Sequence, residues 1–189
     1  MNLKLLHIFL LSTGGTLLLC TPLIHTTELV NGLVIGKMCW FHLVMLFFSV
    51  CVFFVALTKR ATAIAFSSSD LLLLTFTGIV LITYKWSLNP EPEKLIFTGQ
   101  LVILWFLLRY ILTAYREFNF FFLFVGMLTG LVEAVWGMQQ LHGYAYSNHS
   151  LFRLTGSFFN LGPYCGYLAA VLPVCLWAAL KFQKGMHYF

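Results

Sequence analysis

Apolar residues form six long runs separated by short polar stretches, and this pattern predicts the secondary structure of the chain. Several runs approach the ~20 residues that an α-helix needs to cross a bilayer. Lipid offers no partner to an open backbone N–H or C=O, so continuous apolar spans of this kind must be helical. The predicted spans are about 5–20, 38–57, 71–86, 95–112, 118–138 and 161–180.

The composition is that of a membrane protein. Hydrophobic residues make up 60% of the 189 positions and charged residues only 9%. The net charge of +5 is scattered singly between apolar blocks, so no basic stripe is present to follow a nucleic-acid backbone. We therefore expect an all-α integral membrane protein, with residues 1–189 forming a single domain of about six transmembrane helices and no nucleic-acid partner.

The distribution of lysine and arginine predicts an orientation. With the N-terminus inside, seven of these residues are cytoplasmic and four are external, which agrees with the positive-inside rule. The adjacent Lys59 and Arg60 contribute most to this difference. Both termini are then cytoplasmic, and the external loops lie near residues 21–37, 87–94 and 139–160. The last of these is called the outer loop below.

The outer loop contains the strongest candidate for binding chemistry, Arg153. A guanidinium group is permanently charged, and its planar set of donors suits phosphate oxygens. Gly156 permits a tight turn, and either Asn160 or Gly162 can cap the sixth span, with Pro163 in its first turn. The positive end of that helix beside the arginine would form an anion cradle. The alternative is an interfacial arginine whose side chain extends to lipid headgroups.

Glu133 is a carboxylate near the outer end of the fifth span, where a buried charge is costly and tends to mark a function or a specific partner. Gln140, seven residues later, lies on the same helical face. Glu133 would pair with Arg153, orient it or transfer a proton, and we favour the orienting role. The alternative is a span that sits deeper, so that Glu133 reaches interfacial water.

Histidine and cysteine positions do not indicate a metal site. His142 and His149 are seven residues apart, with no carboxylate or thiol near them in sequence. The five cysteines are odd in number and show no C-x-x-C spacing. His149 is a weak candidate for a general base because it precedes Arg153 by four residues, and an ordinary polar loop histidine is the alternative. No metal or other cofactor is expected.

Aromatic residues gather near the outer ends of the last two spans. Membrane proteins place such belts at the interface without further function. Stacking on sugar rings or contact with an isoprenoid chain is the functional alternative. The residues are Trp136, Tyr144, Tyr146, Tyr164 and Tyr167.

The segment Arg153-Leu-Thr-Gly-Ser-Phe-Phe-Asn160, followed by Gly162-Pro163-Tyr164, resembles the R-x-x-G-[ST]-F-x-N-P opening of the O-antigen ligase and polymerase superfamily. The stretch from Glu133 to Gly143 is similar to the helix that leads into this motif. The resemblance implies a bacterial inner-membrane glycosyltransferase that is active on the periplasmic side. Such enzymes transfer glycan from an undecaprenyl diphosphate carrier to a lipid A core, a polysaccharide or a protein.

The resemblance also assigns roles to residues of the motif. Arg153 would stabilise the carrier's diphosphate, which is electrostatic catalysis of a familiar kind. The remaining candidates for substrate binding are Thr155, Gly156, Ser157, Asn160 and Tyr164.

Two departures from the family pattern limit what the resemblance implies. Leu161 stands where the family has proline, although Pro163 follows closely. Members of the family also have more spans, and a later periplasmic loop supplies a second arginine and a histidine base. The chain therefore resembles the N-terminal half of a family domain, and we expect it to be inactive alone. The alternatives are a non-catalytic module that binds or transports polyprenyl-linked glycan and a small multi-span protein that docks a partner.

Overall fold

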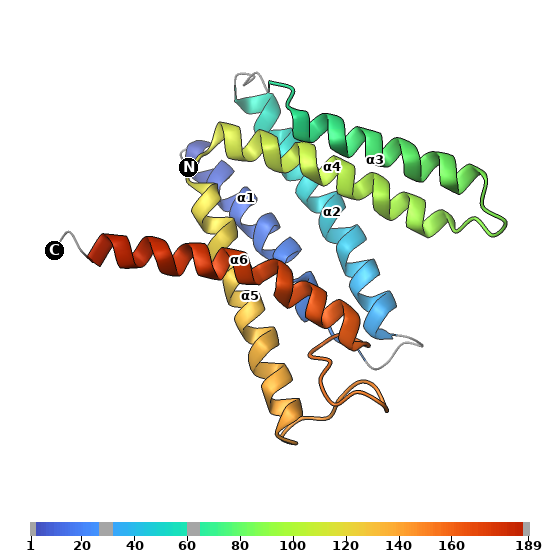
Figure 1. Cartoon of the computed structure of the whole chain (residues 1–189). Coiled ribbons are helices and arrows are strands. Elements are labelled where there is room, and N and C mark those ends of the chain that lie inside the picture. Colours follow the sequence, from blue (N-terminus) through green and yellow to red (C-terminus); the bar gives the residue numbers. More distant parts are fainter. Residues whose placement is uncertain (1–2, 27–31, 60–64, 187–189) are drawn as a thin grey trace. The chain divides into compact units, whose positions relative to one another are not determined.

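The computed structural model describes residues 3–26, 32–59 and 65–186, with side chains as far as Lys181. The described residues are helical apart from turns and loops, which confirms the all-α part of the predicted fold class, whereas the cytoplasmic placement of both termini stays a prediction. A 3-10 turn, η1 (Thr21–Leu23), follows the first helix. The helices are α1 (Leu3–Leu19), α2 (Gly32–Thr58), α3 (Ser68–Lys85), α4 (Pro92–Ala114), α5 (Phe118–Leu141) and α6 (Leu161–Met186) (Figure 1).

Five helices, α2 to α6, are long and apolar enough to cross a membrane, as expected for a multi-pass membrane protein. Helix α1 is apolar but has only 17 residues. At ~1.5 Å per residue it is about 25 Å long, which is slightly less than the ~30 Å thickness of a bilayer's hydrocarbon core.

Several helices extend further than the hydrophobic pattern predicted, and two of these extensions concern the site. Helix α2 begins at Gly32 rather than near residue 38, so Lys37 belongs to the helix. Helix α5 continues to Leu141, so Gln140 is helical and the connection to α6 is residues 142–160. The sequence boundaries were placed at polar side chains, but these two side chains have hydrogen-bond partners inside the protein. Arg60 and residues 27–31, which entered the predicted orientation, lie outside the described residues.

Contacts between Cα atoms divide the chain into two compact units. The first unit comprises residues 1–46 and 119–189, and the second comprises residues 47–118. The first therefore contains α1, the beginning of α2, nearly all of α5, and α6. The second contains the rest of α2 with α3 and α4.

In the first unit, α5 and α6 pack closely where they cross (Figure 1). A Cβ atom on Gly130 would lie 2.6 Å from Cγ1 of Val171, and one on Gly137 would overlap the Tyr164 hydroxyl. Small residues at such positions allow two membrane helices to approach each other closely. The Tyr167 hydroxyl and the Thr129 hydroxyl are hydrogen-bonded at 2.7 Å in the same interface.

Within the same unit, helix α1 contacts α2 through a hydrogen bond and α5 through a glycine. Trp40 Nε1 in α2 donates to the Leu17 carbonyl at 3.0 Å. A Cβ atom on Gly15 would overlap the ring of Phe122 in α5. The hydrogen bond joins the end of α1 to the start of α2, whereas Phe122 lies in the first turns of α5, at the end away from the connection to α6.

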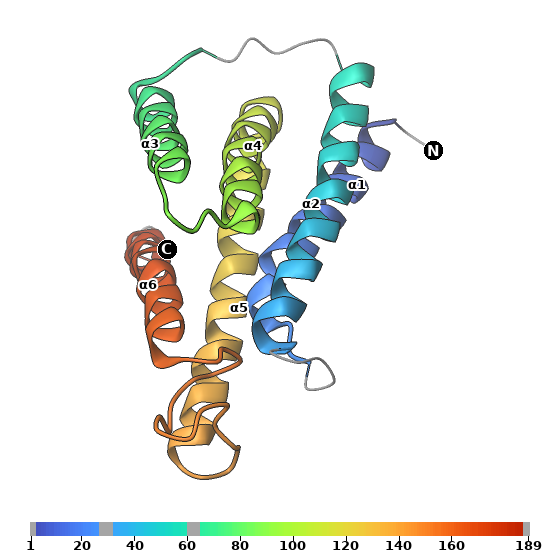
Figure 2. The same ribbon diagram turned by 90° about the vertical axis from the view of Figure 1, so that its right-hand side faces the viewer.

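In the second unit, α3 and α4 form an antiparallel hairpin and lie side by side (Figures 1 and 2). A capping box formed by Ser67 and Asp70 is present at the start of α3. The Ser67 amide donates to Asp70 Oδ2 at 2.7 Å, which satisfies a donor at the helix N-terminus. At the same end of the hairpin, the Lys59 ammonium donates to the Ala114 carbonyl at the C-terminus of α4.

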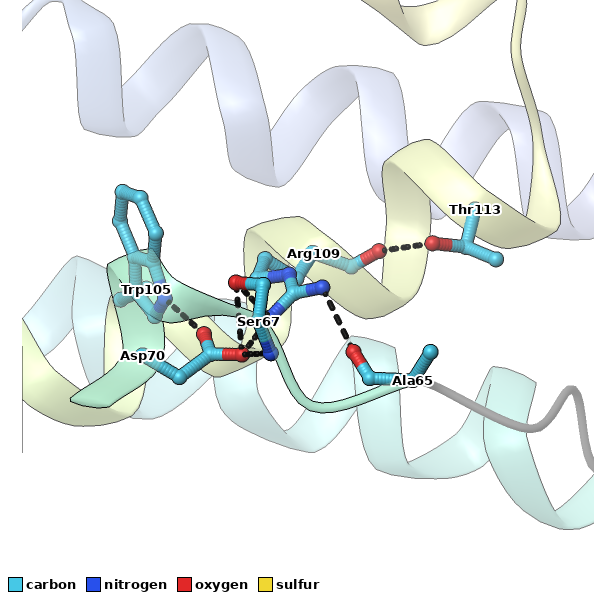
Figure 3. A network of polar contacts seen from close by, with 6 residues as sticks. All are labelled: Ala65, Ser67, Asp70, Trp105, Arg109 and Thr113. Carbon is cyan, nitrogen blue, oxygen red and sulfur yellow. Dashed lines mark hydrogen bonds and ion pairs between the residues drawn. The ribbon is translucent and has the colours of Figure 1, made fainter.

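Asp70 is also the centre of a polar cluster that joins α3 to α4 (Figure 3). Its carboxylate is fully buried, and it accepts hydrogen bonds from Arg109 and, at 2.8 Å, from Trp105 Nε1. The Arg109 guanidinium also donates to the Ser67 hydroxyl at 3.2 Å and to the Ala65 carbonyl at 2.9 Å. The pair of charges is thus surrounded by hydrogen-bonding partners.

Candidate anion-binding site

The connection between α5 and α6 is fixed by the side chain of Gln140, which is buried at the end of α5. Its Oε1 atom accepts hydrogen bonds from the amides of Thr155 at 2.9 Å and Gly156 at 2.7 Å. Its Nε2 atom donates to the carbonyls of Tyr146 and Gly156, both at 3.0 Å. One side-chain amide therefore ties two separate parts of the outer loop, at Tyr146 and at residues 155–156, to the helix.

Glu133 lies two turns before Gln140 on the same face of α5. Its carboxylate holds Ser157, the loop residue that follows Gly156. Its side chain is 0% exposed. Oε2 accepts the Ser157 amide at 3.0 Å, and Oε1 accepts a hydrogen bond from the Ser157 hydroxyl. The alternative in which Glu133 reaches interfacial water does not fit this burial. Both carboxylate oxygens are used to fix the loop backbone.

Lys37 approaches the same serine from α2. Its ammonium donates to the Ser157 hydroxyl at 2.9 Å and to the Pro22 carbonyl in η1. It also lies 4.8 Å from the centre of the Phe158 ring, as a cation–π contact. Lys37 and Glu133 attract each other electrostatically through this shared hydroxyl. The three elements η1, α2 and α5 thus converge on one loop residue.

Gly156 adopts a backbone conformation that favours glycine, with φ of +55°. A Cβ atom there would overlap Glu133 Oε2 and would lie 2.6 Å from Cδ2 of Tyr164. Tyr164 is itself buried, and its hydroxyl donates to the Glu133 carbonyl at 3.3 Å. The tight turn expected at Gly156 is therefore present, and it exists because the chain passes directly over a buried carboxylate.

Arg153 lies three residues before this turn and is exposed. No hydrogen bond or ion pair joins its guanidinium to any residue between 3 and 26, 32 and 59, or 65 and 181. Residues 134–189 contain no aspartate or glutamate, so no acid follows Glu133 in the sequence. The pairing of Arg153 with Glu133 considered from the sequence is not observed, because Glu133 is directed at Ser157. The guanidinium is available to an external anion.

The start of α6 contributes less to an anion cradle than the sequence suggested. Asn160 precedes the helix, and its Oδ1 atom accepts the Gly162 amide at 3.4 Å. The Tyr164 amide is directed at the Asn160 carbonyl at 3.5 Å, and Pro163 has no N–H. Two of the first amides are therefore used within the protein. Asn160 itself is exposed.

His149 sits between two aromatic rings of the outer loop. Its ring centroid is 4.8 Å from that of Phe152 and 5.3 Å from that of Phe159. Nδ1 accepts the Leu151 amide at 3.0 Å. A neutral His149 in this arrangement carries its proton on Nε2 and presents a donor there, so it suits binding of an anion better than removal of a proton.

The structure thus separates the candidate residues into two groups. Arg153 and Asn160 are exposed, whereas the side chains of Thr155, Ser157 and Tyr164 face inward, as does the turn at Gly156. The inward group fixes the loop, with Thr155 held by Gln140 and accepting the Asn148 amide at 3.2 Å. In this conformation these buried groups support the exposed pair and do not themselves meet a ligand.

Sequence reasoning did not assign Lys37 and Gln140 to the site. Lys37 was counted only as an external charge, because an isolated lysine next to an apolar run usually marks the end of a span. The spacing of Glu133 and Gln140 on one helical face was a usable signal for Gln140. No local signal pointed from Lys37 to Ser157, since 120 residues separate them.

Comparison with protein-family models, curated proteins and solved structures finds no match to this chain.

Proposed function

We propose that this protein binds the diphosphate of a lipid-linked glycan at the membrane surface, as part of an O-antigen ligase-type glycosyltransferase. The acceptor would be a lipid A core, a polysaccharide or a protein, and the membrane would be the bacterial inner membrane with both termini cytoplasmic. The observation that carries the proposal is a single one. Arg153 is an exposed guanidinium with no partner among the residues whose side chains the structure describes, on a loop whose backbone is fixed by buried Glu133 and Gln140.

A fixed loop matters because preorganised charge binds an anion without first reorganising the protein. The resemblance of residues 153–164 to the superfamily motif supports the choice of a polyprenyl diphosphate over other anions. A lipid-linked ligand would also suit the apolar surroundings of the arginine, where Leu151 is 82% exposed and Phe159 is 48% exposed.

The test is binding of farnesyl diphosphate, as a short polyprenyl diphosphate, to the full chain in detergent. We expect Arg153→Ala to weaken binding about tenfold or more, because a charge-assisted hydrogen bond contributes roughly 1.5–3 kcal/mol. The affinity of Arg153→Lys should lie between those of the wild type and Arg153→Ala, since lysine keeps the charge but not the planar pair of donors. Arg116→Ala removes the same charge from the exposed connection between α4 and α5 and is the matched control.

Competition with phosphatidylglycerol separates the proposal from simple attraction to headgroups. If the phospholipid displaces the diphosphate at equal concentration, or if Arg153→Ala binds as well as the wild type, the proposal is wrong. Orientation is tested separately with Arg153→Cys in a chain without its five native cysteines. An impermeant maleimide added outside intact cells should label that position.

A second candidate is a non-catalytic module that holds the same ligand. It is favoured by the state of the two candidate bases, since both oxygens of Glu133 and Nδ1 of His149 accept hydrogen bonds within the protein. Glycan transfer by the full chain, lost in Arg153→Ala, would favour the enzyme. Binding without transfer would favour the module.

A further inference from the structure

Lys37 is a charged side chain in the first turns of a membrane helix, where an uncompensated ammonium is costly. Its donors are directed at the Pro22 carbonyl and the Ser157 hydroxyl, and its remaining face lies against Phe158. None of these partners carries a negative charge. The nearest compensating charge is Glu133, on the other side of the Ser157 hydroxyl.

Glu133 is likewise a charged side chain that needs a compensating charge, here a positive one. It is fully buried, and both of its oxygens are directed at Ser157. A hydroxyl has one proton, so when Ser157 donates to Glu133 its oxygen remains free to accept the Lys37 N–H. Ser157 is therefore the bridge through which a carboxylate on α5 and an ammonium on α2 compensate each other.

We infer that Lys37 is a positioning residue for Arg153, because it and Glu133 clamp the loop at Ser157 from opposite sides. The pair of charges, rather than either charge alone, holds the loop backbone at Ser157, next to the residues that Gln140 holds. Ser157 is not a nucleophile in this arrangement, since it is fully buried. The clamp bears on ligand binding only through the proposed function, on which that consequence rests.

The prediction is a coupling between two substitutions. Lys37→Met leaves the buried Glu133 carboxylate uncompensated, and removing one member of a buried pair disturbs a protein more than removing both. Glu133→Gln keeps an oxygen that accepts a hydrogen bond from Ser157, but it leaves Lys37 without its counter-charge. In the double variant neither charge remains, so the loop should recover part of its order.

Backbone hydrogen exchange, measured by mass spectrometry on a peptide that contains residues 154–158, reports the clamp without any ligand. We expect Lys37→Met to accelerate exchange on the order of tenfold, and the double variant Lys37→Met/Glu133→Gln to exchange more slowly than Lys37→Met alone. Lys37→Arg, which keeps the charge, should stay close to the wild type. Lys85→Met, at the exposed end of α3, is the control for loss of a lysine.

Peptides from the α5–α6 interface distinguish a released loop from a protein that has failed to fold, because their exchange should not change. If Lys37→Met leaves exchange at residues 154–158 unchanged, or if the effects of the two substitutions simply add, the inference is wrong.

Binding of farnesyl diphosphate to the same variants gives the second measurement. Lys37→Met should weaken binding severalfold, and Glu133→Gln should weaken it less than Arg153→Ala does. If the wild type does not bind the diphosphate while the exchange coupling is present, the proposed function fails and the clamp stands. If the wild type binds and Lys37→Met changes neither exchange nor binding, the clamp fails and the proposed function stands.

Discussion

Arg109 in the second unit and Arg153 in the first carry the same guanidinium group, but their surroundings differ. Arg109 donates to Asp70, Ser67 and Ala65, and its side chain is only 24% exposed (Figure 3). Arg153 is exposed and has no partner among the residues that the structure describes. The comparison shows that an arginine in a membrane protein is informative through its partners. One arginine joins two helices, and the other is the residue that we propose binds a ligand.

The two buried carboxylates differ in the same way. Asp70 pairs directly with an arginine and connects α3 to α4. Glu133 accepts hydrogen bonds from the backbone amide and the hydroxyl of Ser157. The same hydroxyl accepts a hydrogen bond from Lys37, which carries the nearest compensating charge. The first arrangement stabilises a helix hairpin, whereas the second stabilises a particular loop conformation. Only the second has a consequence for the surface on which Arg153 lies.

The largest expected effect is the loss of the hairpin when the Asp70–Arg109 pair is broken. Arg109→Ala leaves Asp70 buried without its cation, and such losses are among the most destabilising single substitutions. We expect the unfolding midpoint in detergent to fall by about 10 °C, whereas Arg153→Ala should shift it by less than about 2 °C. Thermal unfolding monitored by tryptophan fluorescence measures both.

The double variant Asp70→Leu/Arg109→Leu sharpens this comparison. It removes both charges and should be more stable than Arg109→Ala. If Arg153→Ala proves as destabilising as Arg109→Ala, Arg153 has a structural role, and the distinction between the two arginines is wrong.

A smaller effect is expected at Gly156, where the loop passes over Glu133. Gly156→Ala places a Cβ against that carboxylate and the Tyr164 ring, at a positive φ, and should cost on the order of 1–3 kcal/mol. The matched control is Gly99→Ala in α4, where no described atom apart from the neighbouring residues and the backbone of the same helix lies within 4 Å of the added Cβ. Because alanine favours a helix interior over glycine, this control should be neutral or slightly stabilising. Equal destabilisation by both substitutions would contradict the importance of the turn.

The membrane helices were predictable from the sequence because the bilayer imposes a simple requirement on length and hydrophobicity. The helix ends near the site were less predictable. Lys37 and Gln140 resemble the polar ends of spans, and only tertiary partners show that they lie within helices. The turn at Gly156 could be predicted from its neighbours in sequence. The Asp70–Arg109 pair could not be predicted, since the α3–α4 hairpin has to form before residues 39 positions apart meet.

The smallest expected effect is at an exposed ion pair that calibrates the buried one. Lys94 Nζ lies 2.9 Å from Glu91 Oε1 at the start of α4, and the two side chains are 77% and 60% exposed. Water already solvates both groups, so their attraction contributes little beyond the entropy lost in holding two flexible side chains together. Lys94→Ala should therefore change the free energy of unfolding by no more than about 0.5 kcal/mol. Thermal unfolding under the same conditions as for Arg109→Ala checks this, at low and high salt. A shift comparable to that of Arg109→Ala would mean that pairing of charges in general, rather than burial, explains the difference between the two arginines.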